Sequence, residues 1–286
     1  MQLGKLGVFL EMIKFEHTLF ALPFAYIGAL LTERQLPTLH NFFWITLAMI
    51  GARTAAMSLN RIIDRRIDAA NPRTSGRALP RALLTPGEVW VYTILSLALL
   101  ALAAYQLSPL AFRLFPLVVF ALTFYSYTKR FTWLCHFFLG ATLGLAPLGA
   151  WVAIADQLAF APVVLGLGVT FWVAGFDIIY ACDDYEFDRQ TGIYSIPARF
   201  GIAKALVIAR LLHALAAAAF LALGALMDLG LYYWLGVSGA VLLLFWQHRL
   251  ISPADLSRTG LVFFSLNGTL SVVMFIFTFL EILSGR

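Results

Sequence analysis

Long apolar segments, separated by shorter polar connections, occupy almost the whole chain of 286 residues. A helix needs roughly 20 mostly apolar residues to cross the hydrocarbon core of a membrane, because each residue advances it by about 1.5 Å. The chain is 61% hydrophobic and only 12% charged, so a water-soluble core could not bury its apolar side chains. The sequence therefore predicts an all-α, polytopic membrane bundle with about nine transmembrane helices, at residues 15–33, 40–60, 88–107, 109–128, 132–153, 159–181, 204–226, 229–248 and 259–282.

The basic residues predict how this bundle is oriented. Loops on the cytoplasmic side of a membrane protein carry an excess of lysine and arginine. With a cytoplasmic N-terminus, the outer side holds only Arg34, Arg113 and Arg286, an asymmetry that predicts an N-in, C-out orientation. The inner loops then hold Arg61, Arg65, Arg66, Arg73, Arg77, Arg81, Lys129, Arg130, Arg189, Arg199, Lys204, Arg249 and Arg258.

The same charges limit the partners that we expect. The net charge of +5 fits membrane topology and local anion binding, and no groove-reading motif or basic soluble module indicates nucleic acid. No protein partner is implied. We expect residues 1–286 to form a single integral membrane domain in the lipid bilayer, and the compact chain without a transit peptide favours a bacterial inner membrane.

An acidic cluster follows the second apolar segment. Asn60, Asp64 and Asp68 are spaced four residues apart, which places them on one face of a helix. Arg53 precedes Asn60 by seven residues and shares that face, although a charged arginine within a membrane span is unfavourable unless it meets an anion or a cavity. Two structural alternatives stand beside a binding site: Arg53 extends to the membrane surface, or Asp64 only pairs with a neighbouring arginine.

A second acidic cluster follows the sixth apolar segment. Asp177, Asp184 and Asp188 share a helix face, and Asp183 lies beside them. So many carboxylates at one membrane depth repel one another unless a cation or protons neutralise them. Oxygen ligands without a compact cage favour Mg²⁺ over Ca²⁺, and scattered histidines disfavour zinc. Asp177, two turns before Asp184, is either a substrate-binding or proton-accepting group or a satisfied carboxylate.

Basic side chains accompany both clusters. The loop after Asp68 carries three arginines whose forked donors suit phosphate oxygens, Arg73, Arg77 and Arg81, although arginines here also satisfy the rule for cytoplasmic loops. Tyr125 lies one helical turn before Lys129, which Arg130 follows. Such a tyrosine and lysine are also ordinary residues of a membrane interface.

Taken together, these motifs resemble the UbiA superfamily of intramembrane prenyltransferases. The resemblance covers essentially the whole chain and rests on the order and spacing of the motifs: Arg53-x6-Asn60-x3-Asp64-x3-Asp68, Tyr125-x3-Lys129-Arg130, and Asp184-x3-Asp188 with Gly192 and Ser195. It implies a nine-helix bundle around a central cavity, with a cytoplasmic cap formed by the loops after the second and sixth helices. It also implies transfer of a polyprenyl chain from its diphosphate to a lipophilic acceptor.

The resemblance implies a role for each motif. Two Mg²⁺ ions on the diphosphate would be held by Asn60, Asp64, Asp68, Asp184 and Asp188. Lys129 and Arg53 would contact the diphosphate or help to fix the acceptor, and Tyr125 would lie near the allylic cation. Because the second motif is unusually acidic, Asp183 and Asp184 are both candidate ligands, and the spacing to Asp188 favours Asp184.

The acceptor distinguishes branches of this family. Stretches such as NPRTSGR and DYEFDRQTGIYSIPARFG look like the branch that prenylates 4-hydroxybenzoate in quinone biosynthesis, with the active site toward the cytoplasm. A dihydroxynaphthoate-type menaquinone precursor is the alternative acceptor. A cation or proton-coupled transporter is the alternative class, since intramembrane carboxylates also mark ion paths, but its acids would lie near mid-span.

Overall fold

The computed structural model describes residues 4–14 and 18–285, and in this part of the chain the regular structure is helical throughout. No strand occurs among these residues, and only an isolated bridge joins Ser252 and Asp255. The prediction of an all-α fold is confirmed. In a membrane, helices satisfy their own backbone hydrogen bonds, which accounts for this architecture in so apolar a chain.

The described residues contain nine helices of sixteen or more residues. They are α2 (Thr18–Glu33), α3 (Leu39–Ala70), α4 (Pro86–Leu107), α5 (Pro109–Thr128), α6 (Cys135–Ala155), α7 (Phe160–Ala181), α10 (Ile202–Leu226), α11 (Leu231–Leu250) and α13 (Asn267–Leu283). The short helices are α1 (Lys5–Met12), the 3₁₀ turn η2 (Cys182–Asp184), α8 (Tyr185–Thr191), α9 (Ile196–Phe200), α12 (Thr259–Leu261) and the π turn η3 (Val262–Leu266). The first predicted segment begins at residues 15–17, which lie outside the described residues.

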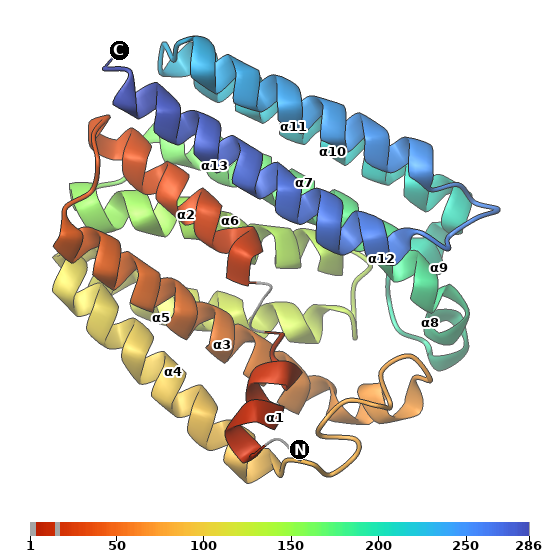
Figure 1. The fold of residues 1–286 in the computed structure, drawn as a ribbon. Helices are drawn as coiled ribbons and strands as arrows, with labels where there is room; N and C mark the ends of the chain where they lie inside the picture. The colour runs from red at the N-terminus through yellow and green to blue at the C-terminus, as the bar shows by residue number, and fades with distance from the viewer. Residues whose placement is uncertain (1–3, 15–17, 286) are drawn as a thin grey trace.

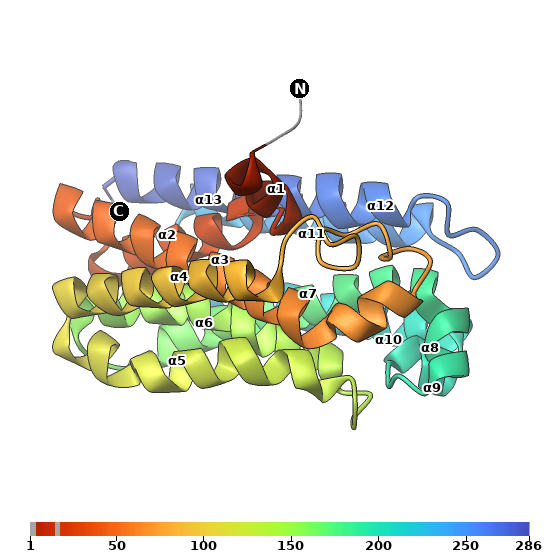
Figure 2. The ribbon, with the colours of Figure 1, turned by 90° about the horizontal axis from the view of Figure 1, so that it is seen from below.

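The long helices pack in chain order and form a closed bundle (Figure 1). Each contacts the next, from α2 through α3, α4, α5, α6, α7, α10, α11 and α13, and α13 packs against α2. Helix α2 also crosses to α6. Seen from below, α1 lies on one face beside the segment that follows α3 (Figure 2).

Seven helical segments in the described part of the chain are long and apolar enough to cross a membrane. They include α3 through α6, α10, the run Phe160–Thr191 and the run Thr259–Leu283, whereas Ala21–Glu33 is a shorter apolar helix. Large apolar side chains such as Leu95 and Leu242 are exposed on the outside, as expected of a protein that faces lipid.

The structure differs from the sequence predictions in two places: the end of the helix that carries the first cluster, and the helix face that the second cluster was expected to share. Helix α3 does not end near residue 60 but continues to Ala70, so the first acidic cluster lies on one unbroken helix. The next residue, Asn71, caps the helix in an extended conformation, because the proline that follows it disfavours the helical region for the residue before it. Helix α7 ends at Ala181, and the chain tightens through η2 before α8 begins. The second cluster is therefore not on one regular helix face.

Candidate functional site

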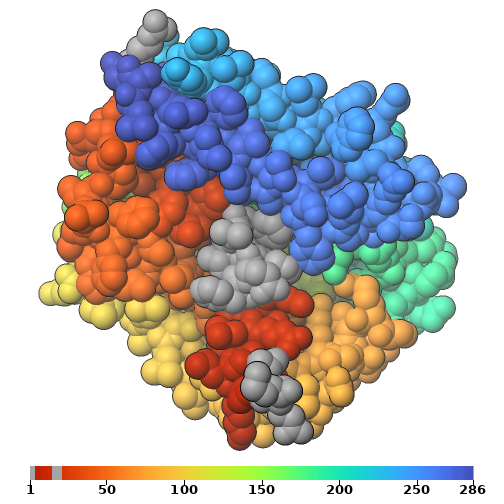
Figure 3. Space-filling model, viewed as in Figure 1, coloured from red at the N-terminus to blue at the C-terminus, as the bar shows by residue number. Residues whose placement is uncertain are grey.

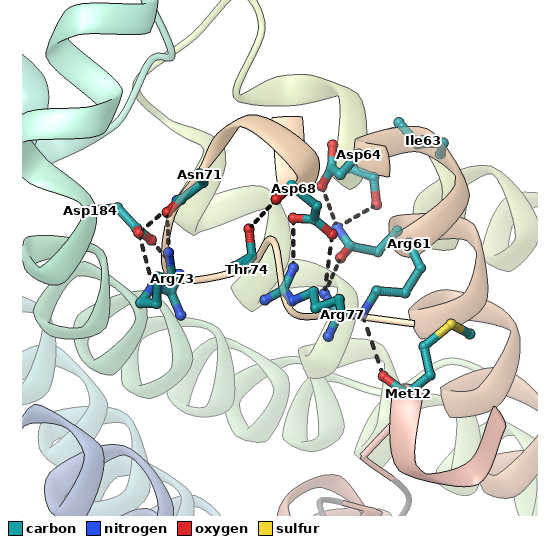
Figure 4. Close-up of polar contacts among 12 residues, drawn as sticks. Met12, Arg61, Ile63, Asp64, Asp68, Asn71, Arg73, Thr74, Arg77 and Asp184 are labelled. Carbon is teal, nitrogen blue, oxygen red and sulfur yellow. Dashed lines mark hydrogen bonds and ion pairs between the residues drawn. The ribbon is translucent and has the colours of Figure 1, made fainter. Parts of the chain in front are cut away.

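The two acidic clusters meet at one end of the bundle. In both ribbon views, the segment after α3 lies at the same end as α8 and α9 (Figures 1 and 2). Asn71 donates from Nδ2 to Asp184 Oδ1 over 2.9 Å. Arg73 donates from Nε to the same oxygen over 2.8 Å and from Nη2 to Asp184 Oδ2. Side chains that directly follow the first cluster thus bind Asp184 of the second cluster, as Figure 4 shows.

Arg73 is held on a second side by Tyr180. Its Nη1 donates to the Tyr180 hydroxyl over 2.7 Å, and the guanidinium carbon lies 4.8 Å from the centre of the tyrosine ring. Burial alone lowers the pKa of Arg73, but the hydrogen bonds and negative charge of Asp184 raise it above its ordinary value. This guanidinium is therefore a fixed positive charge between the two clusters.

Asp64 forms ion pairs with the two basic residues that follow α5. Its side chain is 1% exposed, with Lys129 Nζ at 2.6 Å from Oδ2 and Arg130 Nη2 at 2.9 Å from Oδ1. Asn60 Nδ2 donates to Asp64 Oδ2 over 2.8 Å. The spacing Asn60-x3-Asp64 does bring these groups together, and the Lys129-Arg130 motif is the partner of Asp64.

Asp68 faces two other arginines (Figure 4). Arg77 Nη1 lies 2.7 Å from Asp68 Oδ1, while Arg61 Nη1 lies 4.0 Å from Oδ2. The buried Oδ2 atom has no hydrogen-bond partner in the described structure. Arg61, itself buried, also donates from Nε to the carbonyl of Met12 over 3.4 Å. From the sequence, Arg61 was expected as a loop charge or as a partner of Asp64, and its position beside Asp68 was not predicted.

In the second cluster, the side chains of Asp183 and Asp184 point to different neighbours. Asp183 accepts from the Thr259 hydroxyl, with distances of 3.0 and 2.8 Å to its two oxygens, so it turns toward α12. Asp184 turns toward the first cluster. Asp188 is buried and accepts from the Ser195 hydroxyl over 2.8 Å. The partners Thr259 and Asn71 were missed, because nothing in the spacing of the motifs relates them to a distant aspartate.

Asp177 has a different environment from the other carboxylates. Its Oδ2 lies 2.7 Å from Nδ1 of His136, near the start of α6. His136 had been grouped with scattered histidines, and its partner was not predicted. Asp177 therefore contacts α6 through a buried imidazole.

Two cavities lie beside the basic residues that accompany the clusters, although no carboxylate of either cluster lines them. The first cavity, of about 470 Å³, is lined by Tyr180, Phe176 and Phe263 and by six basic residues, Lys14, Arg53, Arg61, Arg73, Arg77 and Arg81. The face viewed in Figure 3 is hollowed between the segment after α3 and the segment of α12 and η3, and both the former and η3 contribute to this lining.

The second cavity, of about 350 Å³, is almost wholly apolar and runs among α3, α4, α5 and α6. Its lining extends on α6 from Leu139 to Ala153. Arg53 lines both cavities, and Tyr125 lines the apolar one while its hydroxyl donates to the carbonyl of Ala56 over 3.3 Å. The two cavities thus adjoin at Arg53.

Carboxylate oxygens are suitable ligands for a hard cation. In this structure, however, they are bonded to other side chains and do not converge on one point. Among the described residues, no three acidic, histidine or cysteine side chains lie close enough to hold a metal ion. Each carboxylate is instead bonded to a basic or hydroxyl group. Carboxylate and amide oxygens are the ligands that Mg²⁺ prefers, and the buried Asp68 Oδ2 accepts no hydrogen bond from the described residues. The donor set fits Mg²⁺ once these side chains exchange partners.

Comparison with known proteins identifies relatives over most of the chain. The model of the UbiA prenyltransferase family matches residues 21–278. A 4-hydroxybenzoate octaprenyltransferase from Pseudoalteromonas translucida is 33% identical over 235 residues, which cover 82% of this chain and 80% of that protein. A 4-hydroxybenzoate solanesyltransferase from Synechocystis sp. is 32% identical over 214 residues, covering 74% of this chain and 72% of its own length.

Solved structures share the fold. The apo structure of a UbiA homolog from Aeropyrum pernix matches with a TM-score of 0.82 at 32% identity, covering 94% of this chain and 98% of that chain. A UbiA homolog from Archaeoglobus fulgidus bound to GPP and Mg²⁺ matches with a TM-score of 0.75 at 21% identity, covering 96% and 99%. The second likeness concerns the fold alone.

Proposed function

The chain belongs to the UbiA prenyltransferase family, and from that membership we propose that it transfers a polyprenyl group from polyprenyl diphosphate to 4-hydroxybenzoate in quinone biosynthesis. The observation that carries this proposal is the junction of the two cavities: a basic one for anions adjoins an apolar one for a hydrocarbon tail. Relatives named for 4-hydroxybenzoate support the acceptor.

The basic residues would bind the diphosphate by exchanging partners. Arg73, Arg77, Lys129 and Arg130 are bonded to Asp184, Asp68 and Asp64. A phosphate offers these cations oxygens of the same charge and geometry as a carboxylate. Turning toward the diphosphate would release the carboxylates without leaving a buried charge uncompensated, which is the main penalty for breaking such pairs.

The released oxygens would hold the metal. The proposed Mg²⁺ ligands are Asn60, Asp64, Asp68, Asp184 and Asp188, with Asp184 preferred over Asp183 because it faces the first cluster. When bound, Mg²⁺ supplies positive charge to the diphosphate and so favours its departure. The fold likeness to a homolog bound to GPP and Mg²⁺ is consistent with this assignment.

The apolar cavity would hold the isoprenoid chain. At its mouth, the Tyr125 ring would stabilise the allylic cation, and the surrounding alkyl groups would exclude water. Arg53, which lines both cavities, would pair with the acceptor's carboxylate or with the diphosphate. Asp177, whose carboxylate contacts His136, would bind substrate or accept the proton that leaves the acceptor.

The membrane arrangement is part of the same proposal. We propose a single domain over residues 1–286 with nine transmembrane helices, oriented N-in and C-out, in a bacterial inner membrane. The nine long helices of the described chain support the number of spans. The lysines and arginines at the end of the bundle that carries the two acidic clusters support the orientation. The active site would then open toward the cytoplasm.

The test is a product assay with several acceptors. Purified protein in lipid nanodiscs is incubated with a labelled polyprenyl diphosphate, Mg²⁺, and either 4-hydroxybenzoate or 1,4-dihydroxy-2-naphthoate, and products are identified by mass. We expect prenylated 4-hydroxybenzoate. If only the naphthoate is prenylated, the proposed reaction stands but the proposed acceptor is wrong. Absence of any prenylated product with active relatives as positive controls would overturn the proposal.

A further inference from the structure

His136 connects three helices within the protein. It is 2% exposed, and its Nδ1 lies 2.7 Å from Asp177 Oδ2 on α7. Its Nε2 lies 3.2 Å from the backbone nitrogen of Ile196, the first residue of α9. The imidazole on α6 thus contacts both α7 and α9.

The two hydrogen bonds define the state of this imidazole. A backbone N–H can only donate, so Nε2 of His136 must accept from Ile196 and carries no proton. The ring proton is then on Nδ1, from which it is donated to Asp177. Asp177 therefore selects the tautomer that can bind the start of α9.

The start of α9 in turn holds Asp188. Ser195 is the N-cap of α9, and its hydroxyl accepts from Ala198 N over 3.3 Å and donates to Asp188 Oδ2 over 2.8 Å. Ser195 precedes Ile196 in the chain, so any shift of Ile196 moves the hydroxyl that orients Asp188. The preceding residue is also tied, because Tyr194 N donates to the carbonyl of Lys129 over 2.8 Å.

We propose that His136 and Asp177 form a positioning pair that orients Asp188 for Mg²⁺ through Ile196 and Ser195. The inference rests on the proposed function, in which Asp188 is a metal ligand. Neither residue of the pair needs to contact substrate. Groups that orient metal ligands through hydrogen bonds typically change metal affinity about 10- to 100-fold when they are removed.

Two substitutions of His136 separate its two nitrogens. The amide oxygen of glutamine can reach the position of Nε2, whereas asparagine reaches only that of Nδ1. Protein in detergent is saturated with geranyl thiodiphosphate, an unreactive analogue, and its melting temperature is followed while Mg²⁺ is added. His136→Asn should raise the Mg²⁺ concentration for half-maximal stabilisation about 10- to 100-fold, and His136→Gln should stay near the wild-type value.

Hydrogen exchange supplies a readout of the intermediate step. The amide of Ile196 should exchange faster in His136→Asn than in His136→Gln, as measured by mass spectrometry on peptides that include α9. The matched control is His213→Asn, which removes another buried histidine, paired with His248 at 2.9 Å on α10 and α11. It should lower the melting temperature without changing the Mg²⁺ requirement.

Asp177 is tested in the same way. Asp177→Asn keeps an oxygen for the Nδ1 proton and should keep the wild-type Mg²⁺ requirement, whereas Asp177→Ala should raise this requirement as His136→Asn does. Combining Asp177→Ala with His136→Asn should add nothing further, because both act through one contact.

The alternatives give different results. Equal Mg²⁺ requirements for wild type, His136→Asn and Asp177→Ala, all folded, would overturn the positioning role. Equal impairment of the asparagine and glutamine variants, shared by the His213 control, would reduce His136 to a packing residue. A wild type that forms prenylated product but needs no Mg²⁺ would refute only the metal step, whereas one that forms no product refutes the proposed function itself.

Discussion

Arg73 holds both carboxylate oxygens of Asp184 across a separation of 111 residues in the sequence. Its Nε lies 2.8 Å from Oδ1, its Nη2 bonds Oδ2, and its third nitrogen reaches the hydroxyl of Tyr180. All three nitrogens of the guanidinium thus donate to Asp184 or Tyr180. A planar fork that fits a carboxylate in this way also fits two oxygens of a phosphate.

Arg73→Lys should therefore impair binding of the diphosphate substrate even though the charge is kept. A single ammonium cannot make the paired contact, and a lost charge-assisted hydrogen bond corresponds to about 1.5–3 kcal/mol, or about 10- to 100-fold in kcat/KM. Steady-state kinetics with varied polyprenyl diphosphate measure the change. Arg65→Lys, at an exposed position of α3, is the matched control and should behave as wild type. Equal kinetics for both variants would contradict the role of the fork.

Asp64→Asn should lower kcat by about 100-fold or more, the range seen when one polar group that stabilises developing charge is removed. The asparagine preserves size and an oxygen but removes the negative charge that Lys129 and Arg130 share. Product formation at saturating substrates measures the loss, and circular dichroism checks the fold. Asp255→Asn, in the exposed loop before α12, should have no effect. Wild-type turnover by Asp64→Asn would remove Asp64 from the metal site.

The sequence allowed the helices to be predicted because burial in lipid requires long apolar segments, whatever their neighbours are. The end of α3 is different. Residues 61–70 are polar enough to look like a loop, but Asp64 and Asp68 find cationic partners, and the helix continues to Ala70. The 3₁₀ turn after Ala181 likewise depends on tertiary contacts of Asp183 and Asp184, which local spacing does not contain.

The sequence predicted which residues belong to the candidate site better than it predicted which of them contact each other. Regular four-residue spacing identified the carboxylates, and a loop rich in arginine identified their counter-charges. Which arginine meets which aspartate depends on how distant helices pack, so Arg73 with Asp184 and Arg77 with Asp68 emerge only from the structure. Asn71 and Thr259 carry no motif of their own and were missed, and Arg61 was expected beside Asp64 rather than Asp68.

Removal of Mg²⁺ should stop turnover without unfolding the protein. The carboxylates of Asp64, Asp68 and Asp184 already have basic partners without a metal, so chelation leaves no new uncompensated charge. Without a diphosphate ligand, melting curves in detergent with and without EDTA should coincide. Product formation should fall to background in EDTA and return when Mg²⁺ is added. A large fall in melting temperature with EDTA would show that a metal supports the fold.

Tyr125→Phe and Tyr125→Leu should have different consequences. The hydroxyl makes only a 3.3 Å contact with a carbonyl, so phenylalanine keeps the ring that faces the apolar cavity and should retain most of the activity. Leucine removes the aromatic face, and loss of a desolvated cation–π contact of about 2 kcal/mol predicts about a 30-fold lower kcat. Single-turnover rates of the two variants measure this difference. Equal rates would show that the ring does not act on the cation.

Gly192→Ala should destabilise the acidic end of the bundle, whereas Gly87→Ala should not. Gly192 ends α8 at φ +72°, a left-handed conformation that alanine adopts at a penalty of about 1 kcal/mol, although no atom lies near enough to clash. Gly87, in the first turn of α4, has equally open surroundings without that conformation, so alanine there favours the helix. We expect a lower melting temperature and a higher Mg²⁺ requirement for Gly192→Ala, because the turn precedes Ser195 and its bond to Asp188. An unchanged melting temperature for Gly192→Ala would place its backbone outside the left-handed region.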